Sequence, residues 1–565
     1  MDATSHCTDS RSPHDGTPSF RRDAAAKLTQ FRQLDSPWTS CCQIAKQIHV
    51  PPRTLSHWVR RHRCLVRESS WPDDVVCFLE SPHGLEFLHR LWTAVHLVFV
   101  QANDTGIRSA TWFLQLSGLE EFIAPSYGAQ QAVAEEVESL LIRFGQEEDR
   151  RLAEQMPPRQ ITLCEDETFH PQICLVAIEP VSNFLLLEQY QPQRDAVTWN
   201  QCLDQRLAGM PLSVVQVTSD EAKALIAHAE IHLGAHHSPD LFHVQQETSR
   251  ATSLALDSQT RAACEEQAKA QEKATALQAQ QDACRQECPE SAFLEEISTQ
   301  IRQAAAEMAA AHRRMSACQD RQQRATAARQ GLSRDYHPFD PTTGQPQTAE
   351  EVAGKLAGHF EVLDQVADEA ELSTHARQKL AKARRGLDAM KATIAFFWAM
   401  IATRLEEWAL EEPLRCLLRE PLIPGYYLQQ MAAKASTAQE RQRLRTLSQE
   451  ILARARSPDG LWGTLSPEVQ ADLASKAREC AEIFQRSSSC VEGRNGQLSL
   501  KHHALHQLTT RKLQALTVLH NYGVQREDGT TAAERFYGGR PQDLFGWLLK
   551  HLSLPTRPRV VRRAA

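Results

Sequence analysis

The feature that most constrains this chain is a glycine-free segment near its middle. Residues 245–330 are dominated by Ala, Gln, Glu and Arg, and Pro289 is their only proline. Such a composition favours long helices over strands or turns. The apolar heptad repeat is weak, so a helical hairpin packed on another part of the chain and a free coiled coil fit the pattern equally well. Helical patterns continue to Ile483, and we predict an all-helical, coiled-coil-like domain over residues 246–485.

Strand-like patterns precede this helical segment. Four β-type runs cover residues 161–166, 173–178, 183–188 and 214–220. A helix capped by Asp195 separates the third run from the fourth, and another helix follows the fourth. Three strands in a meander, a helix, a strand and a helix are similar to the opening of an RNase H-like α/β domain. The closing helix comes only after residue 486, so we predict an RNase H-like core made of residues 160–245 and 486–550. The chain as a whole should be predominantly helical.

Both ends of the chain are basic, although its net charge is −7. Residues 21–67 contain ten Lys or Arg residues against two Asp, and residues 494–565 contain twelve against four acidic residues. Basic ends around an acidic middle suit a protein whose ends contact phosphate. For the basic tail, residues 551–565, a solvated segment is the alternative explanation.

Two helical regions with DNA-binding character follow residues 1–20, which we expect to be disordered. Within residues 21–67, Val50-Pro51-Pro52 separates two short helices, and the second is basic. This arrangement is typical of a helix-turn-helix, in which the second helix enters the major groove. We expect DNA contacts from Arg53, Thr54, Ser56, His57, Arg60 and Arg61. We predict a second helical, DNA-binding-like domain over residues 71–155. For Trp112 and Tyr127 in this domain, a core position and a DNA-facing position are the alternatives, and the apolar neighbours of Trp112 favour the core.

The sequence also predicts a cytoplasmic protein. It has no uninterrupted run of about 18 apolar residues and no apolar segment near its N-terminus that resembles a secretion signal. Its fifteen cysteines are an odd number and contain no CxxC pair. Neither a disulfide framework nor a zinc ribbon is therefore indicated.

Two aspartates stand where metal-dependent chemistry is easy to place. Asp166 ends the first β-type run and Asp220 ends the fourth. In open α/β sheets the carboxyl ends of neighbouring strands face a shared crevice, and paired carboxylates suit hard divalent cations. For either residue alone, a polar turn is the commoner explanation. Glu165 and Glu167 flank Asp166, so the role could fall on any of these three residues.

A third carboxylate, Glu492, lies in the first turn of the closing helix. Asn495 follows on the same helical face, and a capping role for Glu492 is the structural alternative. Gly493 and Gly496 are poor helix formers, which points to the close approach of a strand or of a DNA backbone. Three carboxylates can hold two Mg²⁺ (or Mn²⁺) ions, which assist in-line displacement at a phosphodiester without a protein nucleophile.

Several motifs resemble those of prokaryotic DDE-type insertion-sequence transposases. The motifs are Cys164–Phe169, Val217–Lys223, Pro239–Val244, Ser487–Gly496 and Asp528–Phe536. The resemblance covers residues 161–245 and 487–545. It implies that Asp166, Asp220 and Glu492 form the catalytic, metal-binding triad, with an all-helical insertion between the second and third acids. It also implies that Asp240 and His243 support the active site, and we add Asn495 as a supporting residue.

These patterns together predict a DNA transposase. It would bind the terminal repeats of a mobile element, then cut and transfer strands into target DNA, with Arg494 and Lys501 contacting DNA beside the site. Pairing two DNA ends implies a homo-oligomer, at least a dimer. The alternative is a catalytically inactive DNA-binding protein derived from such an enzyme. A coiled-coil scaffold built on residues 245–330 is a third hypothesis, which leaves both basic ends unexplained.

Overall fold

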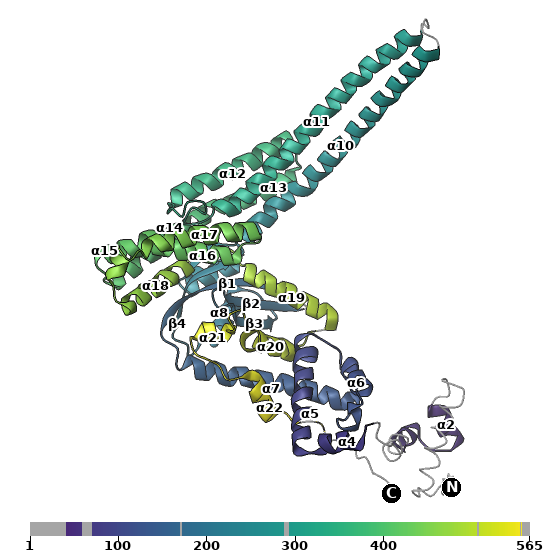
Figure 1. Cartoon of the computed structure of the whole chain (residues 1–565), viewed down its shortest axis with the longest axis vertical. Helices are drawn as coiled ribbons and strands as arrows, with labels where there is room; N and C mark the ends of the chain where they lie inside the picture. The colour runs from purple at the N-terminus through teal and green to yellow at the C-terminus, as the bar shows by residue number, and fades with distance from the viewer. Residues whose placement is uncertain are drawn as a thin grey trace, which may run out of the picture. The chain divides into compact units, whose positions relative to one another are not determined.

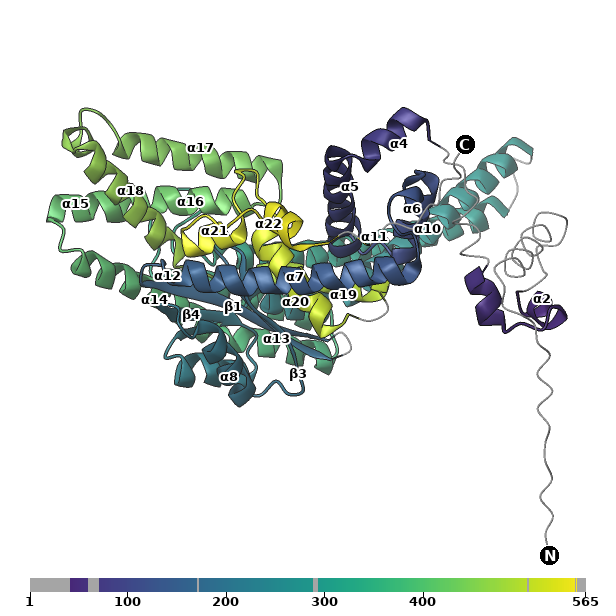
Figure 2. The same cartoon turned by 90° about the horizontal axis from the view of Figure 1, so that it is seen from below.

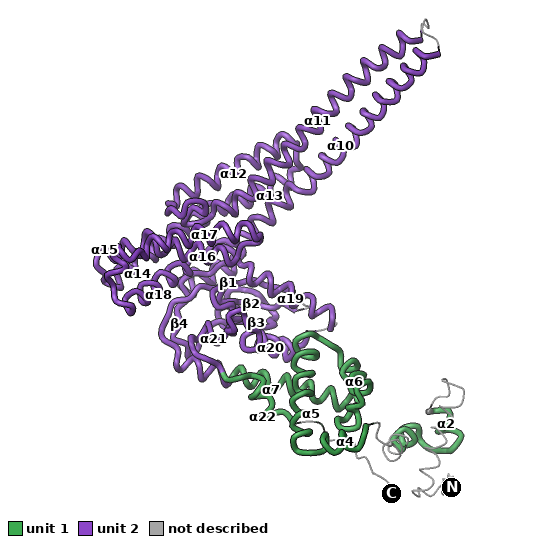
Figure 3. Tube along the Cα trace, in the orientation of Figure 1, with its two compact units in different colours: residues 1–146, 542–565 green, residues 147–541 purple. Residues whose placement is uncertain are grey.

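The structure, a computed structural model, places most of the chain in two compact units. It describes residues 41–58, 71–169, 172–287, 293–505, 508–553 and 555. One unit comprises residues 1–146 and 542–565, and the other residues 147–541 (Figure 3). Helices predominate, as predicted, and one five-stranded sheet lies in the larger unit. Within the described ranges, every helix is too short or too polar to span a bilayer.

The smaller unit is helical. Its elements are α2 (Cys41–Gln47), α4 (Asp73–Glu80), α5 (Pro82–Val95), η1 (His96–Ala102), α6 (Ile107–Leu116), η2 (Leu119–Glu121), α22 (Leu544–His551) and most of α7 (Tyr127–Ala153). Its core centres on Trp92, whose indole donates to the Gln130 side chain at 2.9 Å. Trp112 is 62% exposed, so the prediction that it lies in the core is wrong. The buried face of α6 carries Ala110 and Leu114 instead.

The predicted helix-turn-helix segment is described over residues 41–58. There α2 and a second short helix, residues 52–58, flank a turn in which His49 has a φ of 51°. Ile44, Ala45 and Leu55 form a small buried core between the two helices. The rest of residues 21–67 lies outside the described residues, as do residues 1–20 and most of the basic tail.

The larger unit is built on a mixed sheet with the strand order β3-β2-β1-β4-β5. The strands are β1 (Arg159–Phe169), β2 (Ile173–Glu179), β3 (Phe184–Gln191), β4 (Leu212–Ser219) and β5 (His236–Pro239). β1, β2 and β3 form an antiparallel meander, and β4 lies parallel to both β1 and β5. The first four strands follow the predicted order. β5 was not predicted, because four residues ending in a proline give no alternating pattern.

Helices cover both faces of this sheet (Figure 2). The elements that follow the strands are α8 (Ala196–Leu207), α9 (Lys223–Ala227), η3 (His228–His232), α19 (Ser489–Leu505), α20 (Thr510–Val518), η6 (Leu519–Gly523) and α21 (Ala532–Tyr537). On one face, Trp199 of α8 is buried against Leu175 and Ala177 of β2. On the other face, the rings of Phe184 and Phe536 stack with centroids 4.2 Å apart. The sheet is therefore a buried middle layer.

The chain between β5 and α19 is mostly helical. Its elements are α10 (Leu241–Glu287), α11 (Phe293–Asp335), α12 (Ala349–Glu369), α13 (Thr374–Arg385), α14 (Leu387–Glu407), α15 (Glu412–Leu417), η4 (Leu418–Leu422), α16 (Ile423–Lys434), α17 (Ala438–Ala455), η5 (Leu461–Thr464) and α18 (Pro467–Glu482). α10 and α11 run side by side as a long hairpin (Figure 1), with Lys273 and Glu307 paired across it at 2.7 Å. Leu256 and Leu332 at its base join the buried core of the other helices. The base of the hairpin is therefore packed on other helices, as one of the two predicted arrangements has it, whereas its outer part extends beyond α12 and α13 as a pair of helices alone (Figure 1).

Candidate functional site

The three acidic residues of β1 point to opposite faces of the sheet. Side chains alternate along a strand, so Asp166 faces α19 while Glu165 and Glu167 face α8. Glu165 is fully buried with an Oε1 3.5 Å from Nε2 of His228. Glu167 accepts a hydrogen bond from the Trp199 indole at 3.3 Å. The pleat therefore separates Asp166 from its acidic neighbours, and β1 continues past Asp166 to residue 169 rather than ending there.

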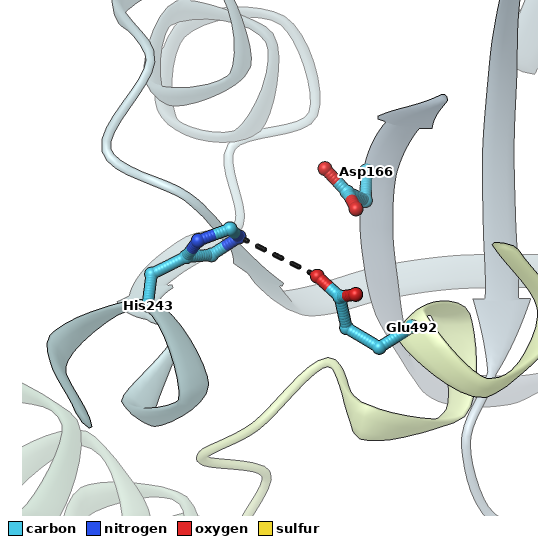
Figure 4. Close-up of side chains that lie close together, drawn as sticks. All are labelled: Asp166, His243 and Glu492. Atoms are coloured by element: carbon cyan, nitrogen blue, oxygen red, sulfur yellow. Dashed lines mark ion pairs between the residues drawn. The ribbon is translucent and has the colours of Figure 1, made fainter. Parts of the chain in front are cut away.

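Three side chains from three elements, one of them Asp166, converge at one point (Figure 4). Asp166 of β1, His243 of α10 and Glu492 of α19 each offer a ligand atom, and these atoms lie within 4.8 Å of one another. Nε2 of His243 is 3.9 Å from Oε1 of Glu492. Asn495, one turn after Glu492, donates from Nδ2 to Oδ2 of Asp166 at 3.0 Å. Four of the predicted site residues thus meet at one place.

Asp220, the second predicted acid, lies at the edge of this group. It directly follows β4, which runs parallel beside β1. Its carboxylate is not one of the three groups within 4.8 Å, and its Oδ1 accepts the backbone N–H of Ala222 at 3.0 Å. Asp220 and His243 line one cavity of about 220 Å³. The structure therefore brings Asp220 next to His243 without making it a member of the group.

Asp240 ties together the two helices that carry His243 and Glu492. It is 1% exposed, and its Oδ1 accepts the backbone N–H groups of Phe242 at 2.9 Å and Ser488 at 3.0 Å. Its Oδ2 accepts the Ser488 hydroxyl at 2.5 Å and lies 3.7 Å from Nε2 of His243. Ser488 immediately precedes α19. One buried carboxylate therefore fixes the start of α10 against the start of α19.

The predicted DNA-contacting residues differ in their surroundings. Arg53, Ser56 and His57 are exposed on the short helix over residues 52–58, and Thr54 is partly buried. Arg60 and Arg61 lie outside the described residues. Lys501 is partly exposed on α19.

Arg494 lies in the interior, so the prediction that it contacts DNA is wrong. It is 5% exposed, and its guanidinium donates to both carboxylate oxygens of Glu188 on β3, at 2.6 and 2.7 Å. Thr517 donates to the same carboxylate at 2.6 Å. Arg494 shares the buried face of α19 with Val491 and Leu498, at helical spacing. No role for Glu188 was predicted from the sequence. The one pattern that could have indicated it is the position of this acid directly after an apolar run.

Gly493 and Gly496 leave part of α19 bare beside Glu492. Both are exposed, and no atom lies within 4 Å of the position where a Cβ would stand on either residue. No strand of the described chain approaches these glycines. The approach of a strand is therefore not the reason for these glycines within the described residues, and the approach of a DNA backbone stays a prediction.

The donor set fits a divalent cation. Nε2 of His243 is buried and makes no hydrogen bond to any described residue, so it is available as a ligand. Asp166 and Glu492 supply carboxylate oxygens next to it. Carboxylates suit Mg²⁺ and Mn²⁺ alike, whereas an imidazole ligand favours Mn²⁺ over Mg²⁺. Three ligands define a position for one ion, and the second predicted ion would need Asp220.

Protons compete with a cation for this site, because burial and neighbouring negative charges raise the pKa of its carboxyl groups. Burial raises the pKa of Asp166 to about 7; the backbone N–H of Glu167 opposes the rise, and the negative charges of Glu492 and Asp220 add to it. Burial also raises the pKa of Glu492, while His243 lowers it. Because the pKa of folded Asp166 lies above the unfolded value of 3.8, its neutral form stabilises the cation-free fold. That contribution is lost as the pH rises through about 7.

We expect cation affinity to rise steeply up to neutral pH. A cation binds the carboxylate form, so one competing proton on Asp166 lowers the affinity about tenfold for each pH unit below its pKa. Calorimetric titration with Mn²⁺ from pH 5.5 to 8.5 should show this slope, with a plateau above about pH 7. Asp166→Asn should bind weakly at every pH. A wild-type affinity that is constant over this range would contradict the assignment of Asp166 as a ligand.

Asp240 should act through position, because it does not belong to the three-ligand group. We expect Asp240→Ala to weaken Mn²⁺ binding by about 10- to 100-fold, the usual cost of losing a group that orients metal ligands. Ser488→Ala, which removes one of the three donors, should have a smaller effect in the same direction. Asp528 lies in an exposed turn, where its carboxylate accepts hydrogen bonds from the backbone N–H and hydroxyl of Thr530, so Asp528→Ala is the control. Equal Mn²⁺ affinity in the Asp240 and Asp528 variants would rule out the positioning role.

Comparison with known proteins gives one family match. Residues 418–564, which include α19 and Glu492, match DUF6399, described as a family of unknown function. No curated protein and no solved structure matches the chain. The match covers about the last quarter of the chain, and it assigns no activity because the function of the family is unknown.

Proposed function

We propose that this chain is a DNA transposase that uses a divalent cation to cut and join DNA strands at the ends of a mobile element. The observation that carries the proposal is the convergence of Asp166 and Glu492 with His243. The two acids lie on opposite sides of the long helical segment in the sequence, yet folding brings their carboxylates to one point.

The sheet is compatible with an RNase H-like core. Among its five strands, β2 alone runs antiparallel to the others, and β1 stands in the centre with β4 beside it. The helical segment follows β5 and ends before α19. That is where the resemblance to DDE-type transposases puts an all-helical insertion.

The chemistry follows from the residues of the group. A bound cation would act as a Lewis acid toward a phosphodiester and would lower the pKa of a water or a 3′-hydroxyl. Asp166 would hold the cation with an orientation fixed by the hydrogen bond from Asn495. Glu492 and His243 would complete the ligand set, and Asp240 would keep their two helices in register. In-line displacement then needs no protein nucleophile.

The surface near Glu492 supports a nucleic-acid substrate. The bare face at Gly493 and Gly496 lets a sugar-phosphate backbone approach α19 more closely than side chains would allow. The exposed Arg53, Ser56 and His57 offer donors for phosphate and base edges on a separate helix. We assign recognition of the element's ends to that helix and strand cleavage to the carboxylate group.

The test is a cleavage assay with the purified full-length protein. The substrate is duplex DNA that carries the sequences flanking the reading frame, incubated with Mg²⁺, with Mn²⁺ or with a chelator. We expect nicks at discrete positions near the element's ends in either cation and none with the chelator. Specific binding without cleavage in both cations would favour the inactive DNA-binding protein. A protein that neither binds nor cleaves this DNA would overturn the proposal.

A further inference from the structure

A large cavity lies in the larger unit, beside the segment that leads to Glu492. Its volume is about 810 Å³, within the range of sites that take small organic groups. The base of the α10–α11 hairpin, helices α16 and α17, and the stretch from Phe484 to Ser489 enclose it. Leu241 in its wall directly follows Asp240, and Ser489 is the first residue of α19. The cavity and the carboxylate group therefore share the same two chain segments.

The lining of this cavity carries an excess of positive charge. Four cationic side chains, Arg334, Lys434, Arg443 and Arg486, line it together with one carboxylate, Glu440. Arg443 donates to both oxygens of Glu440, at 2.6 and 2.9 Å, and so neutralises the one acid. Arg334 pairs with the adjacent Asp335 at 3.0 Å. Lys434 and Arg486 are the two cationic side chains of the lining whose partners are not yet described.

Lys434 and Arg486 have no anionic partner among the described residues. Nη1 of Arg486 donates to the carbonyl oxygens of Ser333 at 2.5 Å and Tyr336 at 3.1 Å, which are neutral acceptors. Lys434 is exposed at the end of α16 and forms no ion pair with any described residue. Arg486 is partly buried, and a partly buried cation without a counter-charge is costly. An anion bound beside Arg486 in this cavity would remove that cost, and Lys434 adds a second positive charge to the same lining.

We propose that this cavity binds a phosphate group of the DNA strand that is processed at the carboxylate group. This inference rests on the proposed function and names a second contact for the same substrate. An arginine fork with a lysine point charge is a typical pair for a phosphate. Met431 and Phe484 offer an apolar wall for the attached nucleoside. Ser487 lines the cavity and Glu492 lies five residues further along the chain, so one short segment joins the cavity to the carboxylate group.

The experiment measures DNA binding by fluorescence anisotropy with the full-length protein and no divalent cation, so that no cleavage occurs. The probe is a labelled duplex with a single-stranded 3′ tail, titrated from 50 to about 300 mM salt. Loss of one phosphate contact on a single strand should lower affinity about fivefold at 0.1 M salt and reduce the salt slope by about 0.7. We expect this result for Lys434→Gln. Lys269 is exposed on α10 without an ion pair among the described residues, so Lys269→Gln is the matched control.

Equal affinity and equal salt slope in the two lysine variants would overturn this inference and leave the proposed function standing. A wild-type protein that does not bind the probe at all would instead count against the proposed function. Arg486→Gln gives a second readout: added inorganic phosphate, against chloride at equal ionic strength, should raise the unfolding temperature of the wild type but not of this variant or Lys434→Gln. If ATP or phosphate occupies the cavity while Lys434→Gln binds DNA normally, the cavity serves a free phosphorylated ligand and the inference is wrong.

Discussion

Cation-dependent cleavage of DNA should fall about a thousandfold when Asp166 is replaced by Asn or Glu492 by Gln. Each substitution removes one carboxylate from a group of three ligands that lie within 4.8 Å of one another. A metal ion at a phosphodiester supplies several kcal/mol of transition-state stabilisation, and about 4 kcal/mol corresponds to a factor of a thousand in rate. Binding of the same DNA without a cation should change little. Single-turnover cleavage and anisotropy titration measure the two effects separately.

The acidic neighbours of Asp166 give this prediction a stringent control. Glu167 is adjacent in sequence but bonds to Trp199 and Arg194 on the other face of the sheet. Glu167→Gln should therefore cleave at a rate close to wild type. Asp220→Asn tests the third acid: a loss as large as for Asp166 would mean that Asp220 joins the ligand set when cation and DNA are bound. Full activity in Asp166→Asn or Glu492→Gln would remove that residue from the site.

The local parts of the fold could be predicted from the sequence because they depend on neighbouring residues. The meander, β4, the cap at Asp195 and the helical hairpin each follow from alternation, capping or composition over short stretches. The residues alone left the choice among the three acids of β1 open, and Asp166 was chosen only through the resemblance to transposases. Alternation says that Asp166 faces away from its two neighbours, but which face meets α19 depends on packing between segments hundreds of residues apart.

Charged residues were the hardest to place from the sequence. Arg494 follows a glycine and sits in a polar, basic stretch, which favours a surface position. Its buried partner Glu188 lies 306 residues earlier, so no local pattern links the two. Arg494 was predicted on the surface and is buried, whereas Trp112 was predicted in the core from its apolar neighbours and is exposed. Composition indicates how many residues are buried, whereas the tertiary fold decides which of them are.

The buried pair between Arg494 and Glu188 should be among the largest single contributors to the stability of the larger unit. Arg494→Met leaves the carboxylate of Glu188 buried with Thr517 as its remaining side-chain donor. Breaking a buried ion pair on one side costs about 3–5 kcal/mol. We expect the midpoint of urea unfolding to fall accordingly. Cleavage should be lost as well, because the pair holds α19 against β3 and α19 carries Glu492.

The double variant Glu188→Leu with Arg494→Met separates the pair's role in folding from a role in binding DNA. Replacing both charges by apolar groups of similar volume is often neutral or stabilising, since no unpaired charge is left behind. We therefore expect the double variant to recover most of the unfolding midpoint that Arg494→Met loses, and to bind DNA as the wild type does. If Arg494 contacted DNA, Arg494→Met would weaken binding at an unchanged midpoint, and the double variant would not restore the affinity.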